Sequence, residues 1–306
     1  MGTGSGPPAA SVAGMGGEQL EMPGMPRRLF SATPSKLATF ADCPRRYRHA
    51  YVDRPTPPKG PPWAHNTVGS AVHAALRSWW DAPRGRRTAV AARQLLYGVW
   101  SDTGFRDAEQ SARWRARAAG WLTDYLAGVD PDDEPVGLER QVAATTSALA
   151  LSGRVDRIDQ RGEELVVVDY KTGRVPSTED EARGSPALAV YVLGVQRTLR
   201  RPCRRVELHH LPSGTVAAFE HTERSLANHV RRAEDVAADI GAATRRLEDG
   251  VHPDEAFPTV TGRHCGWCDF RPSCAAGRAA TPARETWSFL PADEPADEPA
   301  EVPAEV

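Results

Sequence analysis

This chain of 306 residues has few lysines, few cysteines and no long apolar segment. No apolar run approaches the ~20 residues of a membrane-spanning helix, and no basic stretch followed by an apolar one marks a secretory signal. A Walker A motif is also missing, which excludes an ATP-driven helicase. We therefore expect a cytoplasmic protein that has no membrane partner.

The two ends differ in composition from the middle of the chain. Residues 1–28 are rich in Gly, Ala and Pro, and residues 279–306 are rich in Pro, Ala and acidic residues. This composition predicts a disordered N-terminal segment (1–28), one folded domain (29–278) and a disordered acidic tail (279–306). Residues 1–26 and 290–306 each carry a net negative charge, and the chain between them carries a mildly positive net charge. A positive charge suits contact with nucleic acid but does not establish it.

The most specific pattern lies in residues 153–173, GRVDRIDQRGEELVVVDYKTG. Two runs rich in Val, Ile and Leu flank Gly162, which predicts a β-hairpin. If Gly162-Glu163 forms a two-residue turn, Arg161 pairs with Glu164. The register of both strands follows from that pair.

Three charged residues then fall on one face of this hairpin. Counting back from the turn places Asp156 opposite Asp169, and Lys171 shares the face of Asp169. Two carboxylates that close repel unless a cation lies between them, and Mg²⁺ is commonly bound in this way. Only three lysines stand among 38 basic residues, so a lysine here suggests a need for a compact amine. A solvated hairpin with its charges in water remains the alternative.

The cysteines give a second signal. Cys265, Cys268 and Cys274 have the spacing of metal ligands, and in a cytosolic protein that spacing favours a metal over disulfides. Zinc and cubane iron–sulfur clusters both accept four cysteines, and spacing alone does not separate them. The candidates for the fourth ligand are Cys43, Cys203 and His264. Cys203 follows a proline between a predicted helix and strand, which favours an ordinary small residue.

The remaining pattern predicts a mixed α/β protein. Residues 67–81 show an apolar stripe of helical spacing, with Thr67 as a possible N-cap and His73 beside the stripe. A histidine in this position is usually a core residue. Further helices are expected at 88–102, 107–128, 186–199 and 225–248, and further strands at 136–146 (carrying Glu139), 206–211 and 215–220.

Asp156 and Asp169-Tyr170-Lys171 resemble the active site of PD-(D/E)XK nucleases. The sequence GRVDRID…VVVDYKTG is similar to that of nucleases of the RecB/AddB type, including stand-alone exonucleases and CRISPR-associated nucleases. The resemblance implies a restriction-endonuclease-like core, a mixed sheet flanked by helices, with a metal-stapled subdomain formed by the two ends of the domain. It also implies a Mg²⁺ or Mn²⁺ site with His73 as a ligand, from the match to G-x-x-x-H, and Glu139 as a weaker candidate. Cys43, Cys265, Cys268 and Cys274 would hold a 4Fe–4S cluster, with zinc as the alternative.

One position departs from that family. Its helix after the D-x-K strand usually carries Q-x-x-x-Y, and here Tyr191 is present but Ala187 replaces the glutamine. We expect a metal-dependent deoxyribonuclease, acting as an exonuclease on single-stranded or frayed DNA in repair or recombination, with a separate helicase or repair protein as a possible partner. The missing glutamine keeps a non-catalytic DNA-binding module with a metal staple as an alternative. A zinc-bound interaction scaffold is the third reading.

Overall fold

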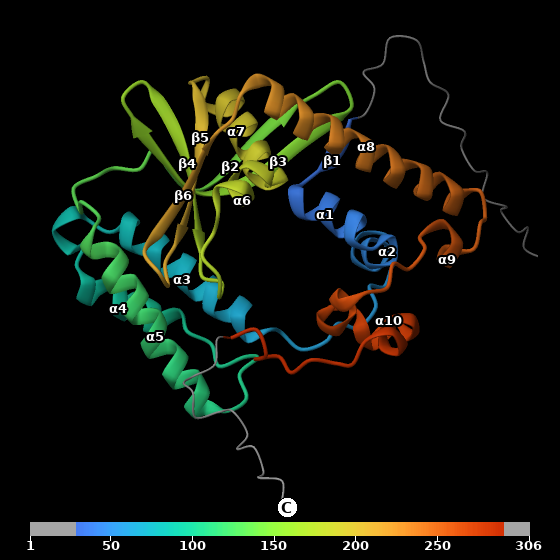
Figure 1. Ribbon diagram of the computed structural model, residues 1–306, viewed down its shortest axis with the longest axis horizontal. Helices are drawn as coiled ribbons and strands as arrows, with labels where there is room; N and C mark the ends of the chain where they lie inside the picture. The colour runs from blue at the N-terminus through green and yellow to red at the C-terminus, as the bar shows by residue number, and fades with distance from the viewer. Residues whose placement is uncertain (1–28, 291–306) are drawn as a thin grey trace, which may run out of the picture.

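The computed structural model describes residues 29–290, which build a six-stranded mixed sheet with helices on both faces (Figure 1). The strands are β1 (Phe30–Ala32), β2 (Gly137–Thr145), β3 (Leu149–Arg161), β4 (Glu164–Lys171), β5 (Cys203–His210) and β6 (Thr215–Glu220). The helices are α1 (Pro34–Asp42), α2 (Pro44–Tyr51), α3 (Ala64–Asp81), α4 (Ala89–Val99), α5 (Ala108–Ala127), α6 (Glu179–Gly184), α7 (Pro186–Leu199), α8 (Glu223–Glu248), α9 (Pro253–Ala256) and α10 (Ala275–Ala280). Short 3₁₀ turns are η1 (Arg84–Arg86), η2 (Arg263–Trp267) and η3 (Arg271–Ser273). The predicted mixed α/β class is confirmed.

The central strand β4 is buried on both faces, which explains its continuous apolar run. Val166, Val168 and Tyr170 pack in one core with α3, α4 and α5. Leu165 and Val167 pack in a second core with α6 and α7. Side chains alternate along a strand, so covering both faces requires consecutive apolar residues. Within the described residues, no helix is both long enough and apolar enough to cross a bilayer.

The predicted hairpin is present, and its register is confirmed. Arg161 pairs with Glu164, and the antiparallel ladder runs back to the pair Arg157–Val168, where it ends. On the same edge of β3, the parallel partner β1 covers only residues 149–151. Because β2 occupies the opposite edge, residues 152–156 of β3 face an opening between β1 and β4. The sheet therefore forks at Asp156.

Helix α3 begins earlier than the sequence suggested, at Ala64 instead of after Thr67. The N–H of Ala64 donates to the carbonyl oxygen of Thr286, and the Thr67 hydroxyl donates to the carbonyl of Thr103 instead of capping the helix. A carbonyl from a distant segment thus satisfies one of the free donors at the helix start.

That distant segment corrects the predicted boundary of the tail. Residues 279–290 were assigned to a disordered tail, yet Leu290 is buried and Trp287 packs against the core formed with α3 to α5. Large apolar side chains amid the polar residues give this stretch enough buried area to dock. The predictions for residues 1–28 and 291–306 lie outside the described residues.

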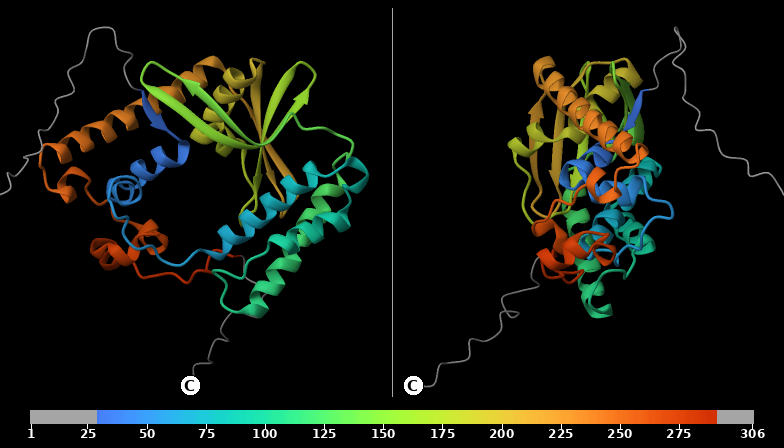
Figure 2. Two further views of the ribbon diagram at one scale, coloured as in Figure 1. Left: turned by 180° about the vertical axis from the view of Figure 1, so that it is seen from behind. Right: turned by 90° about the vertical axis from the view of Figure 1, so that its right-hand side faces the viewer.

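The two ends of the domain lie side by side, as both views in Figure 2 show. The N–H of Arg45 in α2 donates to the carbonyl of Pro258, and the N–H of Gly60 donates to the carbonyl of Asp269. These contacts bring the α1–α2 turn, which contains Cys43, next to the segment that contains η2, η3 and α10. The N-terminal and C-terminal segments thereby form one substructure.

Candidate functional site: a carboxylate–histidine centre at the fork of the sheet

Three side chains from three elements converge at the fork. His73 comes from α3, Glu139 from β2 and Asp156 from β3, and one ligand atom from each lies within 4.8 Å of the other two. Helix α3 packs by its apolar stripe, which sets His73 against the strands. Carboxylate and imidazole groups in such a set can hold a divalent cation.

Glu139 reaches the site through an unusual backbone conformation. Its φ is +44°, although it lies inside β2, between the paired residues Leu138 and Arg140. A non-glycine residue in this left-handed region costs on the order of 1–3 kcal/mol and is common at functional sites. From this position, opposite Asp156 in the unbroken register of β2 and β3, the Glu139 carboxylate reaches His73 and Asp156 and accepts a 2.8 Å contact from Nε of Arg154.

Hydrogen bonds orient His73 and Asp156. Nε2 of His73 donates to the main-chain carbonyl of Tyr170 at 3.1 Å, which leaves Nδ1 facing Asp156 Oδ2 at 3.4 Å. The N–H of Tyr170 donates to the same Asp156 Oδ2 at 2.9 Å. With its proton on Nε2, the ring presents the lone pair of Nδ1 to the site, the form in which imidazole binds metals.

Asp169 and Lys171 lie at the end of β4, beside this group. Lys171 Nζ contacts Asp169 Oδ2 at 2.6 Å. The compact set of ligand atoms contains Glu139, which the sequence ranked second, and does not contain Asp169. The Asp156–Asp169 pair expected from the register lies just beyond the last ladder pair, where the strands separate.

The electrostatics of the site favour a cation. Burial and then the charge of Asp156 raise the pKa of Glu139. Burial raises the pKa of Asp169 despite the Lys171 ammonium, and Asp156 raises it further. Burial lowers the pKa of His73, but the hydrogen bond to Asp156 and the neighbouring carboxylates bring it above its usual value. A divalent cation would offset this repulsion, so the donor set fits Mg²⁺ or Mn²⁺.

Two cavities flank the centre and share His73, Arg154 and Asp156. One of about 800 Å³ also contains Glu139 and Lys171 in its walls. The other, of about 670 Å³, lies toward α7 and is lined by Ala187 and Tyr191. Burial and then the charges of Asp169 and Asp156 raise the pKa of Tyr191 to about 12, so its hydroxyl stays protonated. An extended ligand can thus pass the centre on both sides.

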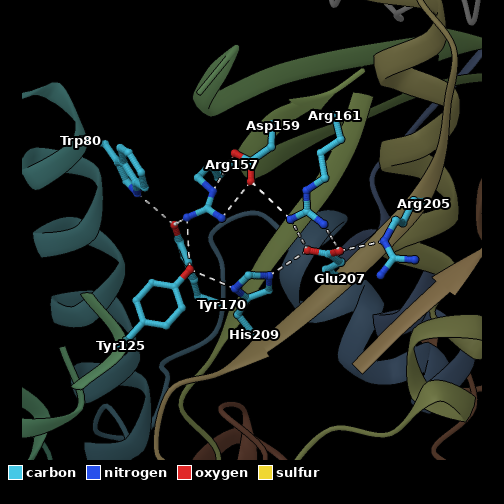
Figure 3. Close-up of polar contacts among 9 residues, drawn as sticks. All are labelled: Trp80, Tyr125, Arg157, Asp159, Arg161, Tyr170, Arg205, Glu207 and His209. Atoms are coloured by element: carbon cyan, nitrogen blue, oxygen red, sulfur yellow. Dashed lines mark hydrogen bonds and ion pairs between the residues drawn. The ribbon is translucent and has the colours of Figure 1, made fainter. Parts of the chain in front are cut away.

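A network of buried and partly exposed polar groups lies on the face of the sheet that packs against α3 and α5 (Figure 3). Arg157 Nη1 donates to the hydroxyls of Tyr125 (3.1 Å) and Tyr170 (3.0 Å), and Nη2 donates to Asp159. Trp80 Nε1 also donates to the Tyr170 hydroxyl. From Tyr125 the network continues through His209 to Glu207, which pairs with Arg161 and Arg205. The sequence did not predict this network; its only local signal is that Arg157 and Asp159, two residues apart, share one face of the predicted strand.

The four cysteines predicted as cluster ligands line one pocket. Cys43 stands between α1 and α2, and Cys265, Cys268 and Cys274 come from the segment that lies beside these helices. Among the described residues, their sulfur atoms do not form a set of three within 4.8 Å of one another. Cys203 lies elsewhere, fully buried in the core with α7, where burial raises the pKa of its thiol to about 12.

Three buried polar atoms around this pocket lack a hydrogen-bond partner among the described residues. Arg45 Nε, His49 Nε2 and Thr259 Oγ1 are buried without a hydrogen-bond partner, and all three residues line the pocket. Buried polar atoms normally have partners, and an ion or cluster is one explanation of such a gap. The N–H of Gly277 already donates to Cys274 Sγ at 3.3 Å. A cubane cluster takes one cysteine at each iron, so it holds its ligands farther apart than a single ion does.

Comparison with known proteins gives a family. A sequence model of the PD-(D/E)XK nuclease superfamily matches residues 31–275. The solved structure of a candidate exonuclease from Eubacterium rectale is 12% identical over 72% of this chain and 82% of its own, with a TM-score of 0.42. The structure of SSO0001 is 14% identical over 83% of this chain and 90% of its own, with a TM-score of 0.35. No curated protein matches the sequence. The family therefore rests on the matched residues 31–275.

Proposed function

This chain belongs to the PD-(D/E)XK nuclease superfamily, and we propose that it is a Mg²⁺- or Mn²⁺-dependent deoxyribonuclease of the RecB/AddB type. The observation that carries this proposal is the convergence of His73, Glu139 and Asp156 beside the Asp169–Lys171 pair. Nucleases of this superfamily hydrolyse phosphodiester bonds, and the mixed sheet flanked by helices is the restriction-endonuclease-like core. The two cavities on either side of the centre provide a path for a DNA strand.

Each residue has a role in this proposal. His73 Nδ1, Asp156 and Glu139 would hold the cation, and Asp169 would add charge from the end of β4. At this position a divalent cation would supply the positive charge that polarises the phosphate and lowers the pKa of the attacking water. Lys171, held by Asp169, orients that water or stabilises negative charge in the transition state. Tyr191 faces the second cavity and can contact the phosphate through its protonated hydroxyl.

The test is Asp156→Asn, which preserves shape but removes the charge that His73 and Tyr170 both face. We expect loss of Mn²⁺-dependent degradation of end-labelled single-stranded DNA, with an unchanged circular dichroism spectrum. Cleavage by the wild-type protein in excess EDTA would contradict a metal mechanism. A circular single-stranded substrate separates exonuclease from endonuclease action, because it has no ends.

We further propose that Cys43, Cys265, Cys268 and Cys274 hold a 4Fe–4S cluster that ties the two ends of the domain together. The shared pocket and the unpartnered polar atoms around it support this proposal. Protein purified without oxygen should be brown, with broad visible absorbance and about four irons per chain, the content of a cubane cluster. A colourless protein with one zinc per chain would instead establish the zinc alternative.

One observation favours a second function, a DNA-binding module without catalysis. Ala187 lines the cavity beside Asp156, at the position where nucleases of the RecB type usually carry glutamine. This alternative predicts DNA binding that does not depend on Mn²⁺ and no cleavage at any metal concentration. The nuclease proposal predicts cleavage by the wild-type protein. Its cellular role would be in DNA repair or recombination, with or without a separate helicase.

A further inference from the structure

We propose that Arg157 is a positioning residue for the metal site and that it acts indirectly, through the hydroxyl of Tyr170. The inference rests on the proposed metal-dependent function. Arg157 touches none of the predicted ligands through its side chain, and its guanidinium is almost completely buried. It lies instead at the centre of the polar network between β4 and helices α3 and α5 (Figure 3). The role of Arg157 depends on the hydrogen bonds that fix the end of β4.

The end of β4 has no strand beside it on the active-site edge. The ladder with β3 ends at Arg157–Val168, so the main chain of Tyr170 faces the opening in the sheet. Its N–H and C=O bond side chains there, Asp156 Oδ2 and His73 Nε2. The main chain of Tyr170 thus orients two of the proposed ligands. On this edge that main chain has no hydrogen bonds to a neighbouring strand in the described part of the chain.

The side chain of Tyr170 replaces part of that support. Its ring is buried, and its hydroxyl accepts hydrogen bonds from Arg157 Nη1 at 3.0 Å and Trp80 Nε1 at 3.3 Å. Asp159 fixes the guanidinium, which also lies over the Trp80 ring at 5.2 Å from its centroid. Arg157 therefore anchors the Tyr170 ring, the ring anchors the main chain, and the main chain orients Asp156 and His73.

The test compares two Tyr→Phe variants of the full-length protein. Tyr170→Phe removes the hydroxyl that Arg157 and Trp80 hold, and Tyr125→Phe removes the other hydroxyl that Arg157 Nη1 contacts. Both changes delete a buried hydroxyl from one network, so both should lower the melting temperature. Only Tyr170→Phe should weaken Mn²⁺ binding, by about tenfold, the lower end of typical losses for partners of metal ligands. The free Mn²⁺ signal in electron paramagnetic resonance measures this affinity without any turnover.

A double-mutant comparison tests the route. Arg157→Lys keeps the charge but cannot contact both hydroxyls and Asp159 as the planar fork does, so it should also weaken Mn²⁺ binding. Combined with Tyr170→Phe, it should add little further loss, because both changes act through one hydroxyl. Additive losses, or equal Mn²⁺ affinity in Tyr170→Phe and Tyr125→Phe, would overturn the inference. If Arg157→Lys fails to fold, the Tyr→Phe pair still decides.

The failure of this inference is distinguishable from failure of the proposed function. If the wild-type protein binds no Mn²⁺, or binds it as well after Asp156→Asn, the metal site itself is wrong. If the wild-type protein binds Mn²⁺ and Asp156→Asn does not, but Tyr170→Phe retains the affinity of Tyr125→Phe, only the positioning role of Arg157 fails. In the expected result, the KM for DNA at saturating Mn²⁺ stays unchanged in Tyr170→Phe.

Discussion

The contact between Gly153 and Tyr191 gives a quantitative prediction about α7. A Cβ added at Gly153 would lie 2.5 Å from Tyr191 Cε1 and 2.8 Å from Cδ1. Carbon atoms in contact are ordinarily about 3.5–4.0 Å apart, so the ring must withdraw by about 1 Å. We expect Gly153→Ala to lower the free energy of unfolding by about 1–3 kcal/mol, as overpacking does. For a domain of this size, each kcal/mol corresponds to about 2–4 °C in melting temperature.

The same displacement tests the role of Tyr191. If its hydroxyl contacts the scissile phosphate, a misplacement of about 1 Å can lower the single-turnover cleavage rate by about 10²-fold. Gly120→Ala is the matched control, because an added Cβ there meets nothing within 4 Å on the exposed face of α5, and alanine should slightly stabilise that helix. An unchanged melting temperature in Gly153→Ala would refute the packing argument. A lowered melting temperature with a wild-type rate would refute the role of Tyr191 in cleavage.

Three further predictions concern the two proposed centres. Lys171→Arg should lower kcat with little change in the KM for DNA, because a planar fork cannot replace a compact ammonium at 2.6 Å from Asp169; wild-type kcat would indicate that Lys171 is only a surface charge. Cys43→Ser should lose iron and melt at a lower temperature, whereas Cys203→Ser should keep its iron, and the reverse pattern of iron content would show that the ligands are misassigned. Burial raises the pKa of Asp169 above its unfolded value, so without metal its stabilising contribution is present at low pH and is lost as the pH rises through the folded pKa. The increase in melting temperature on adding Mn²⁺ should therefore grow as the pH rises above the unfolded pKa of Asp169, and an increase that does not change with pH would contradict this.

Local sequence patterns determined the elements that carry the site. The position of Gly162 fixed the hairpin register, because side-chain direction in a strand follows from counting residues. The run LVVV predicted the second strand of that hairpin, and the apolar stripe beside His73 predicted a helix. The spacing of Cys265, Cys268 and Cys274 identified a group of thiols within one segment. Each of these signals operates over a few neighbouring residues.

Tertiary structure decided which distant groups meet. The sequence ranked Glu139 second, because no local pattern shows that a left-handed residue within β2 will direct its carboxylate to His73. It left the fourth cysteine open, since only the packing of the α1–α2 turn against the C-terminal segment sets Cys43 in the same pocket as the other three. It placed residues 279–290 in a disordered tail, whereas Leu290 is buried against apolar side chains of helices that lie far away in the sequence. It gave no role to Arg157, whose partners on three other elements come together only through the packing of α3 and α5 against β4. Burial and charge pairing depend on all the elements that pack at one point, so they follow from the assembled fold and not from any single stretch of sequence.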